Sequence, residues 1–200
     1  MTVILHYPAY RQPCVTTLAL QWQRINLTDA FIGTNITFMG NQKSDEWGTP
    51  ESIFNLLPSG GYYDPCPGPN QPIEFNRSNG NITVWRNQYY QDALDLENLW
   101  EGYNFVNPPF SNIEAFIIKA IQLHKDFGKW SVIVMPDHTD CKWYRRTVQP
   151  SYFPVVWIGR HKFIPMQNQK VSSPAFGTGL MFVGYSNIIV NQVIQSVKPD

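Results

Sequence analysis

The sequence has few charged residues and no excess of either sign. Charged residues make up 15% of the 200 residues, and 15 basic residues balance 15 acidic ones, so the formal net charge is zero. A strongly basic chain would attract nucleic acid through its whole electric field. Any nucleic-acid partner of this chain must therefore meet a local basic patch.

Cysteine is scarce, and long apolar runs are missing. Cys14, Cys66 and Cys141 are odd in number and widely separated, which favours reduced thiols in an intracellular protein. No apolar run approaches the roughly 20 residues that a membrane helix needs. The N-terminus lacks the basic start and apolar core of a signal peptide. We expect a cytoplasmic protein without a membrane partner.

The composition favours a folded chain with two unequal parts. Hydrophobic residues reach 43% and aromatic residues 14%, which is not a disordered composition. Residues 1–44 are polar and rich in Thr and Asn, and segments 18–23 and 35–39 alternate like short strands. We interpret residues 1–44 as an N-terminal extension or β-hairpin and residues 45–200 as the main domain.

The main domain begins with a helix signal and contains a second one. Thr49 has the character of an N-cap, with Pro50 at the first helical position. Ser111 and Glu114 have the spacing of a capping box before a helix whose apolar residues recur at helical intervals from 113 to 124. Both patterns predict helices that pack on a sheet.

Apolar segments between these helices predict the strands. We expect them at residues 62–63, 104–107, 131–135, 155–158 and 179–183, and the stretch 60–87 should otherwise be mostly loop. This order predicts an α/β sandwich that binds ligands at the carboxyl ends of its strands. Four polar residues should then share that edge: Asp64, Asp92, Asn107 and Asp137.

The strand at 104–107 ends in a rigid tetrapeptide, Asn107-Pro108-Pro109-Phe110. Asn107 offers a side-chain carbonyl, and Pro108 offers a backbone carbonyl next to locked φ angles. Two acceptors on a rigid frame match a group with two N–H donors, such as an exocyclic amine. Phe110 offers a flat face on which a base can stack. This is catalysis by positioning, with little need for a strong base.

Asn-Pro-Pro-Phe fits the [Asp/Asn/Ser]-Pro-Pro-[Tyr/Phe/Trp] motif of amino-methyltransferases that use S-adenosylmethionine. The surrounding chain resembles the phage-type DNA N6-adenine methyltransferase family, related to Dam enzymes, over about residues 45–185. The resemblance rests on further segments in the family's order: Glu46-Trp47-Gly48-Thr49-Pro50, Tyr63-Asp64-Pro65-Cys66, Asp92-Ala93-Leu94, residues 135–143, Gly159-Arg160-His161-Lys162-Phe163 and Ser173-Pro174-Ala175-Phe176.

The resemblance implies a Rossmann-like S-adenosylmethionine-dependent fold, DNA as partner, no metal, and a host cell infected by a phage or carrying a prophage. It implies that Asn107, Pro108, Pro109 and Phe110 are catalytic and hold an adenine flipped out of the duplex. The implied cofactor contacts are Trp47, Thr49, Pro50, Asp64, Pro65, Cys66, Asp92, Ala93 and Asn107. The implied substrate contacts are Phe110, Asp140, Trp143, Arg160 and Lys162.

Other functions stay open on the residues alone. The motif also suits cytosine N4, RNA adenine or a protein glutamine as the acceptor. The loop Asp64-Pro65-Cys66-Pro67-Gly68-Pro69 has no Gly-x-Gly turn, so a catalytically silent nucleic-acid-binding module is a third hypothesis. His138 and Cys141 could belong to a zinc or a nucleophilic site, with Cys66 and His161 as the remaining metal ligands.

The basic clusters and two tryptophans also allow two interpretations. Arg145-Arg146 and Arg160-His161-Lys162 are either ordinary solvated surface or contacts to DNA phosphates beside the target pocket. Trp143 and Trp157 are either core residues or stacking platforms.

Overall fold

The computed structural model describes residues 47–67, 74–76, 82–86, 93–165 and 175–197. Several parts of the sequence-based interpretation lie outside these residues: the N-terminal extension of residues 1–44, Glu46, Gly68-Pro69, Asp92, and Ser173-Pro174.

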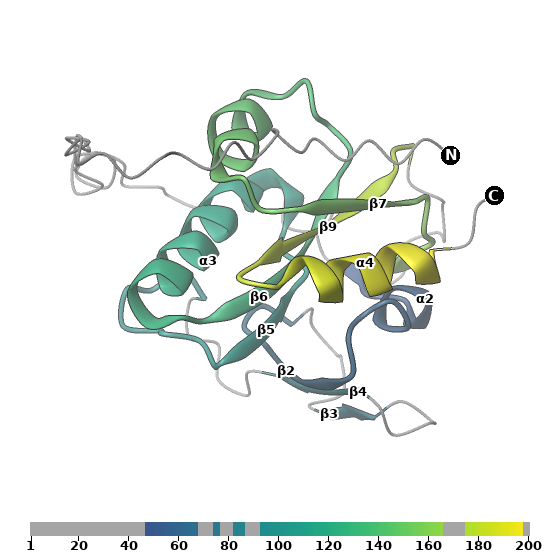
Figure 1. Cartoon of the computed structure of the whole chain (residues 1–200), viewed down its shortest axis with the longest axis horizontal. Helices are drawn as coiled ribbons and strands as arrows, with labels where there is room; N and C mark the ends of the chain where they lie inside the picture. The colour runs from purple at the N-terminus through teal and green to yellow at the C-terminus, as the bar shows by residue number, and fades with distance from the viewer. Residues whose placement is uncertain (1–46, 68–73, 77–81, 87–92, 166–174, 198–200) are drawn as a thin grey trace, which may run out of the picture. The chain divides into compact units, whose positions relative to one another are not determined.

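A seven-stranded mixed sheet organises the described chain (Figure 1), in the order β3-β4-β2-β5-β6-β9-β7. Strands β4, β2, β5 and β6 are parallel, whereas β9 runs antiparallel to both β6 and β7, and β3 antiparallel to β4. The strands are β2 (Gly60–Asp64), β3 (Glu74–Asn76), β4 (Ile82–Arg86), β5 (Tyr103–Val106), β6 (Trp130–Pro136), β7 (Val155–Gly159) and β9 (Thr178–Val183). The expected strands are confirmed, and the fold is a Rossmann-like α/β sandwich.

Two short strands form a separate ladder. β1 (Trp47–Gly48) pairs antiparallel with β8 (Ile164–Pro165), with Trp47 opposite Pro165. This pair brings the start of the described chain to the segment that follows β7.

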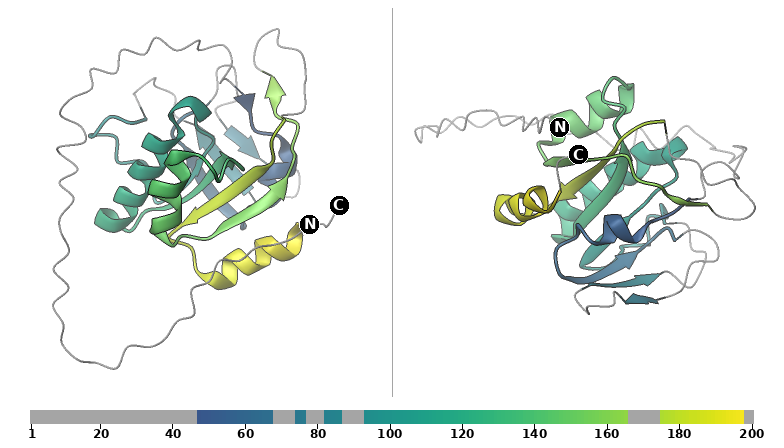
Figure 2. Two further views of the ribbon diagram at one scale, coloured as in Figure 1. Left: turned by 90° about the horizontal axis from the view of Figure 1, so that it is seen from above. Right: turned by 90° about the vertical axis from the view of Figure 1, so that its right-hand side faces the viewer.

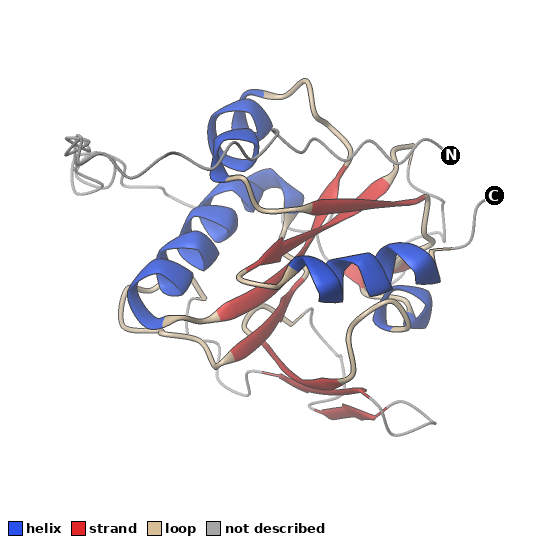
Figure 3. Cartoon of the chain, viewed as in Figure 1, coloured by secondary structure: helices blue, strands red, loops and turns tan. Residues whose placement is uncertain are grey.

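Helices cover both faces of the large sheet (Figures 2 and 3). α3 (Ile113–Phe127) packs on one face with Ile133, Met135, Met181 and Val183. α2 (Glu51–Phe54) and α4 (Asn187–Ser196) pack on the other with Val132, Val134, Leu180 and Phe182. Alternate residues of β6 and β9 thus enter different cores, as the two-residue period of a strand requires. Both faces are buried, which explains the continuous apolar runs in the sequence.

Shorter helical segments connect these elements. A 3₁₀ turn, η2 (Phe110–Asn112), precedes α3. Between β6 and β7 lie a π-helical segment, η3 (Tyr144–Val148), and a 3₁₀ turn, η4 (Gln149–Ser151). Within the described ranges, no helix combines the length and apolar character that crossing a membrane requires.

The prediction of Thr49 as an N-cap was wrong by one residue. Pro50 is the N-cap, with φ −74° and ψ 153°, and the helix runs only from Glu51 to Phe54. Because Pro50 is extended, Thr49 lies one residue too early to cap the first turn, and its side chain is buried instead.

The capping box was also wrong. Asn112 is the N-cap of α3 and makes no side-chain capping bond, whereas Ser111 lies inside the preceding turn η2. Glu114 binds Arg146 and Thr147, whose side chains offer its carboxylate charged and neutral donors. Glu114 thus binds Arg146, which is distant in sequence, and not the backbone at Ser111 that the capping box predicts.

The stretch 60–87 contains more strand than its Gly- and Asn-rich sequence predicts. β4 pairs in parallel with all five residues of β2, from Gly60 opposite Ile82 to Asp64 opposite Arg86. Ile82 and Val84 enter the same core as Tyr62. Pairing and burial override local propensity here. The helix α4 was not expected at all, although Val190 and Val193 have helical spacing and are buried.

Gly179 gives the clearest test of sheet packing. A Cβ added there would lie 2.5 Å from Cζ3 and 2.7 Å from Cε3 of Trp157 on the neighbouring strand. We expect Gly179→Ala to lower the free energy of unfolding by about 1–3 kcal/mol, the range for overpacking a core. Urea denaturation followed by circular dichroism measures the change. Gly102→Ala is the matched control, since nothing lies within 4 Å of its Cβ position. Equal midpoints for both variants would contradict this packing.

Candidate active site at the carboxyl edge of the sheet

Three of the four expected polar residues share one edge of the sheet. Asp64 is the last residue of β2, Asn107 follows β5, and Asp137 follows β6. These three strands are parallel, so their carboxyl ends meet at the same edge. This placement confirms the prediction for Asp64, Asn107 and Asp137.

The side chain of Asn107 is oriented by a residue 60 positions earlier. Its Nδ2 donates a hydrogen bond of 3.0 Å to the backbone carbonyl of Trp47 in β1. Because the amide donor is used in this way, the Oδ1 atom is left as an acceptor. The β1–β8 ladder holds Trp47 in place, and Trp47 also packs against the core beside α2.

The backbone carbonyl groups of Pro108 and Pro109 have different hydrogen-bonding roles. The carbonyl of Pro109 accepts the backbone N–H of Asn112 at 3.0 Å, which closes the turn η2. The turn does not use the carbonyl of Pro108, a residue that is itself buried. Asn107 Oδ1 and the Pro108 carbonyl are thus two acceptors on a frame with restricted backbone angles.

The loop after β2 lies against Asn107. The Asp64 side chain is only 3% exposed, and its Oδ1 accepts the backbone N–H of Cys66 at 3.1 Å. Burial raises the pKa of the Cys66 thiol well above its usual value. The Asp64 carboxylate adds to this rise, and a hydrogen bond from the backbone of Asn107 partly offsets it. The first expected cofactor loop and the tetrapeptide are therefore in direct contact.

Phe110 stands among other aromatic rings. Its centroid lies 6.3 Å from that of Phe163, at an interplanar angle of 87°, and 5.8 Å from that of Phe176, at 63°. Phe176 in turn lies 5.1 Å from the ring of His138. Sequence reasoning gave no role to Phe163 or Phe176, although each closes one of the motifs named above.

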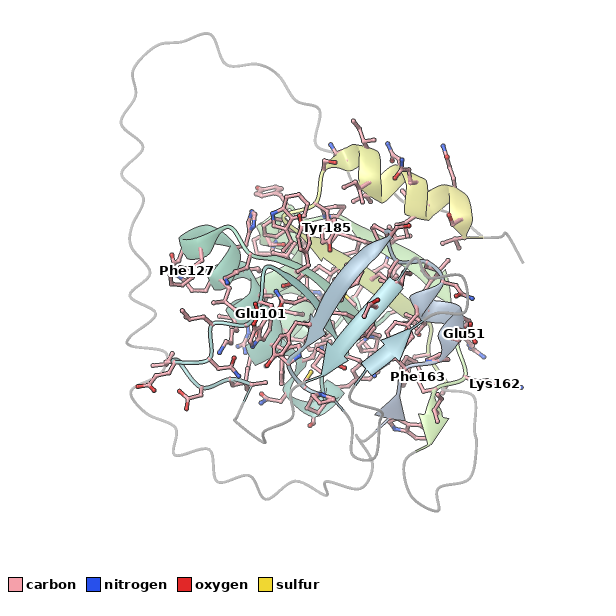
Figure 4. All side chains as sticks on the ribbon, turned by 90° about the horizontal axis from the view of Figure 1, so that it is seen from below. Glu51, Glu101, Phe127, Lys162, Phe163 and Tyr185 are labelled. Atoms are coloured by element: carbon pink, nitrogen blue, oxygen red, sulfur yellow. The ribbon has the colours of Figure 1, made fainter. Side chains whose placement is uncertain are left out.

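The expected basic contacts lie near this group. Arg160 and Lys162 are exposed on either side of His161. The His161 ring binds the Ile158 carbonyl through Nε2 and Ser52 Oγ through Nδ1, both at 3.0 Å, which ties the segment to α2. Figure 4 shows Lys162 and Phe163 beside Glu51, at the opposite end of the fold from Glu101 and Phe127.

The remaining residues expected to contact cofactor or substrate lie in several different environments. Asp140 is exposed, and Trp143 is half-buried against the core of α3, near Tyr144. The carbonyl of Ala93 accepts the indole N–H of Trp100 at 2.9 Å. Thr49 and Pro65 are buried and Pro50 is half-buried. Among the described residues, none of these six forms a hydrogen bond or a ring contact with the tetrapeptide.

The structure also bears on the alternative zinc site and on the basic cluster Arg145-Arg146. Among the described residues, no three His, Cys, Asp or Glu side chains gather closely enough to hold a metal ion. Both arginines of the first basic cluster are exposed, and Arg146 forms an ion pair with Glu114.

The Rossmann-like sheet carries the Asn-Pro-Pro-Phe turn directly after a central parallel strand, the segment in which the sequence resembles methyltransferases that act on amines. The family model described as DNA N-6-adenine-methyltransferase (Dam) matches residues 37–198. The match covers more than half of the chain, so the protein belongs to the Dam family, whose members methylate the N6 amine of adenine in DNA. Membership implies S-adenosylmethionine as methyl donor and DNA as substrate. No curated protein matches the chain.

The raised pKa of Cys66 makes a testable prediction about alkylation. The thiolate is the reactive form, so a raised pKa leaves less of it at any pH below that value. We expect labelling of Cys66 by iodoacetamide to keep accelerating above pH 9.0, the ordinary thiol value. Mass spectrometry of the peptide that contains Cys66 gives the rate, with urea-unfolded protein as control. A rate that levels off below pH 9 in the folded protein would contradict this environment.

Glu114 predicts a pH dependence of stability. Its hydrogen bonds with Arg146, and secondarily with Thr147, lower the pKa of the carboxyl group below its ordinary 4.5. A lowered folded-state pKa stabilises the fold above the unfolded pKa, and this contribution is lost as the pH falls below 4.5. The urea midpoint of wild type should thus exceed that of Glu114→Gln at pH 7, and the difference should be smaller at pH 3.

The effect should be small, because Arg146 is 68% exposed and water screens the pair. Glu97→Gln, which changes an exposed carboxylate outside this cluster, is the control. A constant difference between wild type and Glu114→Gln at both pH values would show that the ion pair is not its source.

Proposed function

We propose that the carboxyl edge described above binds a flipped adenine at Asn107-Pro108-Pro109-Phe110 and S-adenosylmethionine beside Asp64. The observation that carries the proposal is the hydrogen bond from Asn107 Nδ2 to the Trp47 carbonyl, 3.0 Å long. It presents Oδ1 as an acceptor, which an amine with two protons requires.

Two acceptors hold the target amine in this proposal. Asn107 Oδ1 takes one N–H and the Pro108 carbonyl takes the other, which favours pyramidal geometry at nitrogen and frees its lone pair. Neither group is a strong base, so the rate enhancement comes from orienting the amine. The proton lost from nitrogen passes to water, after transient transfer to Asn107. Phe110 provides the face on which the base stacks. In a duplex that amine is paired, so the base has to be flipped out first.

The residues beside Asn107 have the chemistry that the cofactor needs. Asp64 is a buried carboxylate held by the Cys66 backbone N–H, and carboxylates suit hydroxyl and ammonium groups of a ligand. We assign cofactor contacts to the segments Trp47–Pro50 and Asp64–Cys66, to Asp92-Ala93, and to Asn107. Bound S-adenosylmethionine supplies a methyl group on a sulfonium sulfur for direct transfer to the amine. The contact of the Asp64–Cys66 loop with Asn107 supports a cofactor position next to the target amine.

The exposed side chains near Phe163 are our candidates for DNA contacts. Arg160 and Lys162 would bind phosphates, which positions the duplex without reading its sequence. Asp140 and Trp143 would contact the substrate from the segment after β6. We further propose that residues 45–200 are the methyltransferase domain and that residues 1–44 are an extension of it.

Asn107→Ala should lower kcat for methyl transfer by about a hundredfold or more, the scale for losing one positioned catalytic group. Most of the affinity for S-adenosylmethionine should remain. The assay uses tritiated S-adenosylmethionine and unmethylated plasmid DNA, followed by digestion to nucleosides and chromatography. Asn187→Ala, at an exposed amide on α4, is the control.

The product analysis separates this proposal from its alternatives. Label in N6-methyladenine supports it, whereas label in N4-methylcytosine, or only in RNA or protein, would overturn the acceptor. Titration calorimetry with S-adenosylmethionine tests the remaining alternative, since a silent binding module would bind no cofactor. Full activity of Asn107→Ala would remove the role of Asn107 even if the product is N6-methyladenine.

A further inference from the structure

The ring of Phe110 meets two other rings, both of which come from distant parts of the chain. Phe163 follows β7 and Phe176 precedes β9, and each meets Phe110 at a steep interplanar angle, 87° and 63°. Aromatic pairs favour such edge-to-face geometry, in which the positive edge of one ring meets the negative face of another. A ring with two such neighbours has little freedom to turn about its side-chain bonds.

The segment that carries Phe176 is fixed to the end of β6. The carbonyl of Gly177 accepts the backbone N–H of Asp137 at 3.0 Å, which extends the β6–β9 ladder by one step beyond Pro136 and Thr178. The Asp137 carboxylate lies so close that a Cβ on Gly177 would be 2.7 Å from its Oδ2. The ring of His138 packs against Phe176 at 5.1 Å.

The segment that carries Phe163 is fixed to α2 and to the end of β7. Phe163 is 6% exposed and belongs to the core of α2 and α4. The hydrogen bonds of His161 to Ser52 and to the Ile158 carbonyl hold the preceding residues. Phe163 is therefore a buried support, and its replacement would disturb the core as well as Phe110.

Phe110 and Phe176 differ from Phe163 because both are only half-buried. A set of rings that served only as core would be closed to solvent, whereas these two are partly open to it. We propose that Phe176 is a positioning residue for methyl transfer: it holds the ring plane of Phe110 in the orientation on which the target base stacks. The proposal rests on the base-stacking role assigned to Phe110 above.

Phe176→Leu keeps an apolar side chain of similar size but removes the ring. Phe110 then loses one of its two edge contacts, and the stacking surface becomes less ordered. We expect kcat/KM for DNA to fall about five- to tenfold, the scale of one aromatic pair. The affinity for S-adenosylmethionine should stay within about twofold of wild type, because the cofactor loop touches Asn107, which this substitution leaves in place.

Steady-state kinetics with unmethylated plasmid DNA and tritiated S-adenosylmethionine, together with calorimetry for the cofactor, test this role. Phe176→Tyr retains the ring and should restore at least half of the wild-type kcat/KM, which a role of mere volume does not require. Phe127→Leu is the matched control, since Phe127 is 54% exposed at the end of α3 and lies away from Phe163 in Figure 4.

The outcomes separate this proposal from the function on which it rests. If Phe110→Leu loses activity while Phe176→Leu matches wild type, Phe176 has no positioning role and the stacking role of Phe110 survives. If Phe110→Leu is fully active, stacking on Phe110 itself is wrong. A loss in Phe176→Leu that Phe176→Tyr does not restore, or an equal loss of cofactor affinity, would also overturn the proposal.

A second variant covers a failure of Phe176→Leu to fold, as judged by circular dichroism. His138→Ala removes the ring that packs on Phe176 from an exposed position, so the fold should tolerate it. It should lower kcat/KM for DNA about two- to threefold, since part of one ring contact is lost. Wild-type kcat/KM in His138→Ala would then count against the proposal.

Discussion

The register of β5 against its neighbours is the constraint on which the site depends. Asn104, fully buried in this strand, accepts the Glu101 backbone N–H and donates to the carbonyls of Glu101 and Trp130. These bonds join the start of β5 to the start of β6, where Trp130 lies opposite Tyr103. A slip of one residue would turn every side chain of β5 to the other face. Asn107 would then point away from Trp47.

That register explains how a chain with no net charge can place polar chemistry at one edge. Asp64, Asn107 and Asp137 lie at or just past the ends of parallel strands, while the buried side chains of these strands are mostly apolar. The ion pair of Glu114 with Arg146 consumes one of the few basic side chains. Attraction of DNA must therefore rely on a small number of exposed cations, and binding should be sensitive to each of them.

Patterns that are local in sequence predicted much of this protein. The strand before Asn107, the turn and the apolar face of α3 follow from residues adjacent in the chain, and the order of the motifs indicated the family. The positions of Asp64, Asn107 and Asp137 followed from the parallel topology alone. By contrast, the bond of Asn107 to Trp47, the rings around Phe110 and the ion pair of Glu114 join segments far apart in sequence. No periodicity or spacing encodes such contacts, and capping rules misassigned Glu114 because they consider only near neighbours.

The partner of the Asn107 amide is a main-chain carbonyl and not a side chain. Every residue has such a carbonyl, so this contact places no demand on which amino acid stands at position 47. It demands only that the backbone of β1 stay beside β5, a task that belongs to the pairing with β8. The orientation of the Asn107 amide thus depends on the path of a distant strand, whereas the side chain at position 47 contributes through its packing on the core. In the proposed mechanism, changes that displace this strand lower methyl transfer while leaving the Asn-Pro-Pro-Phe segment untouched.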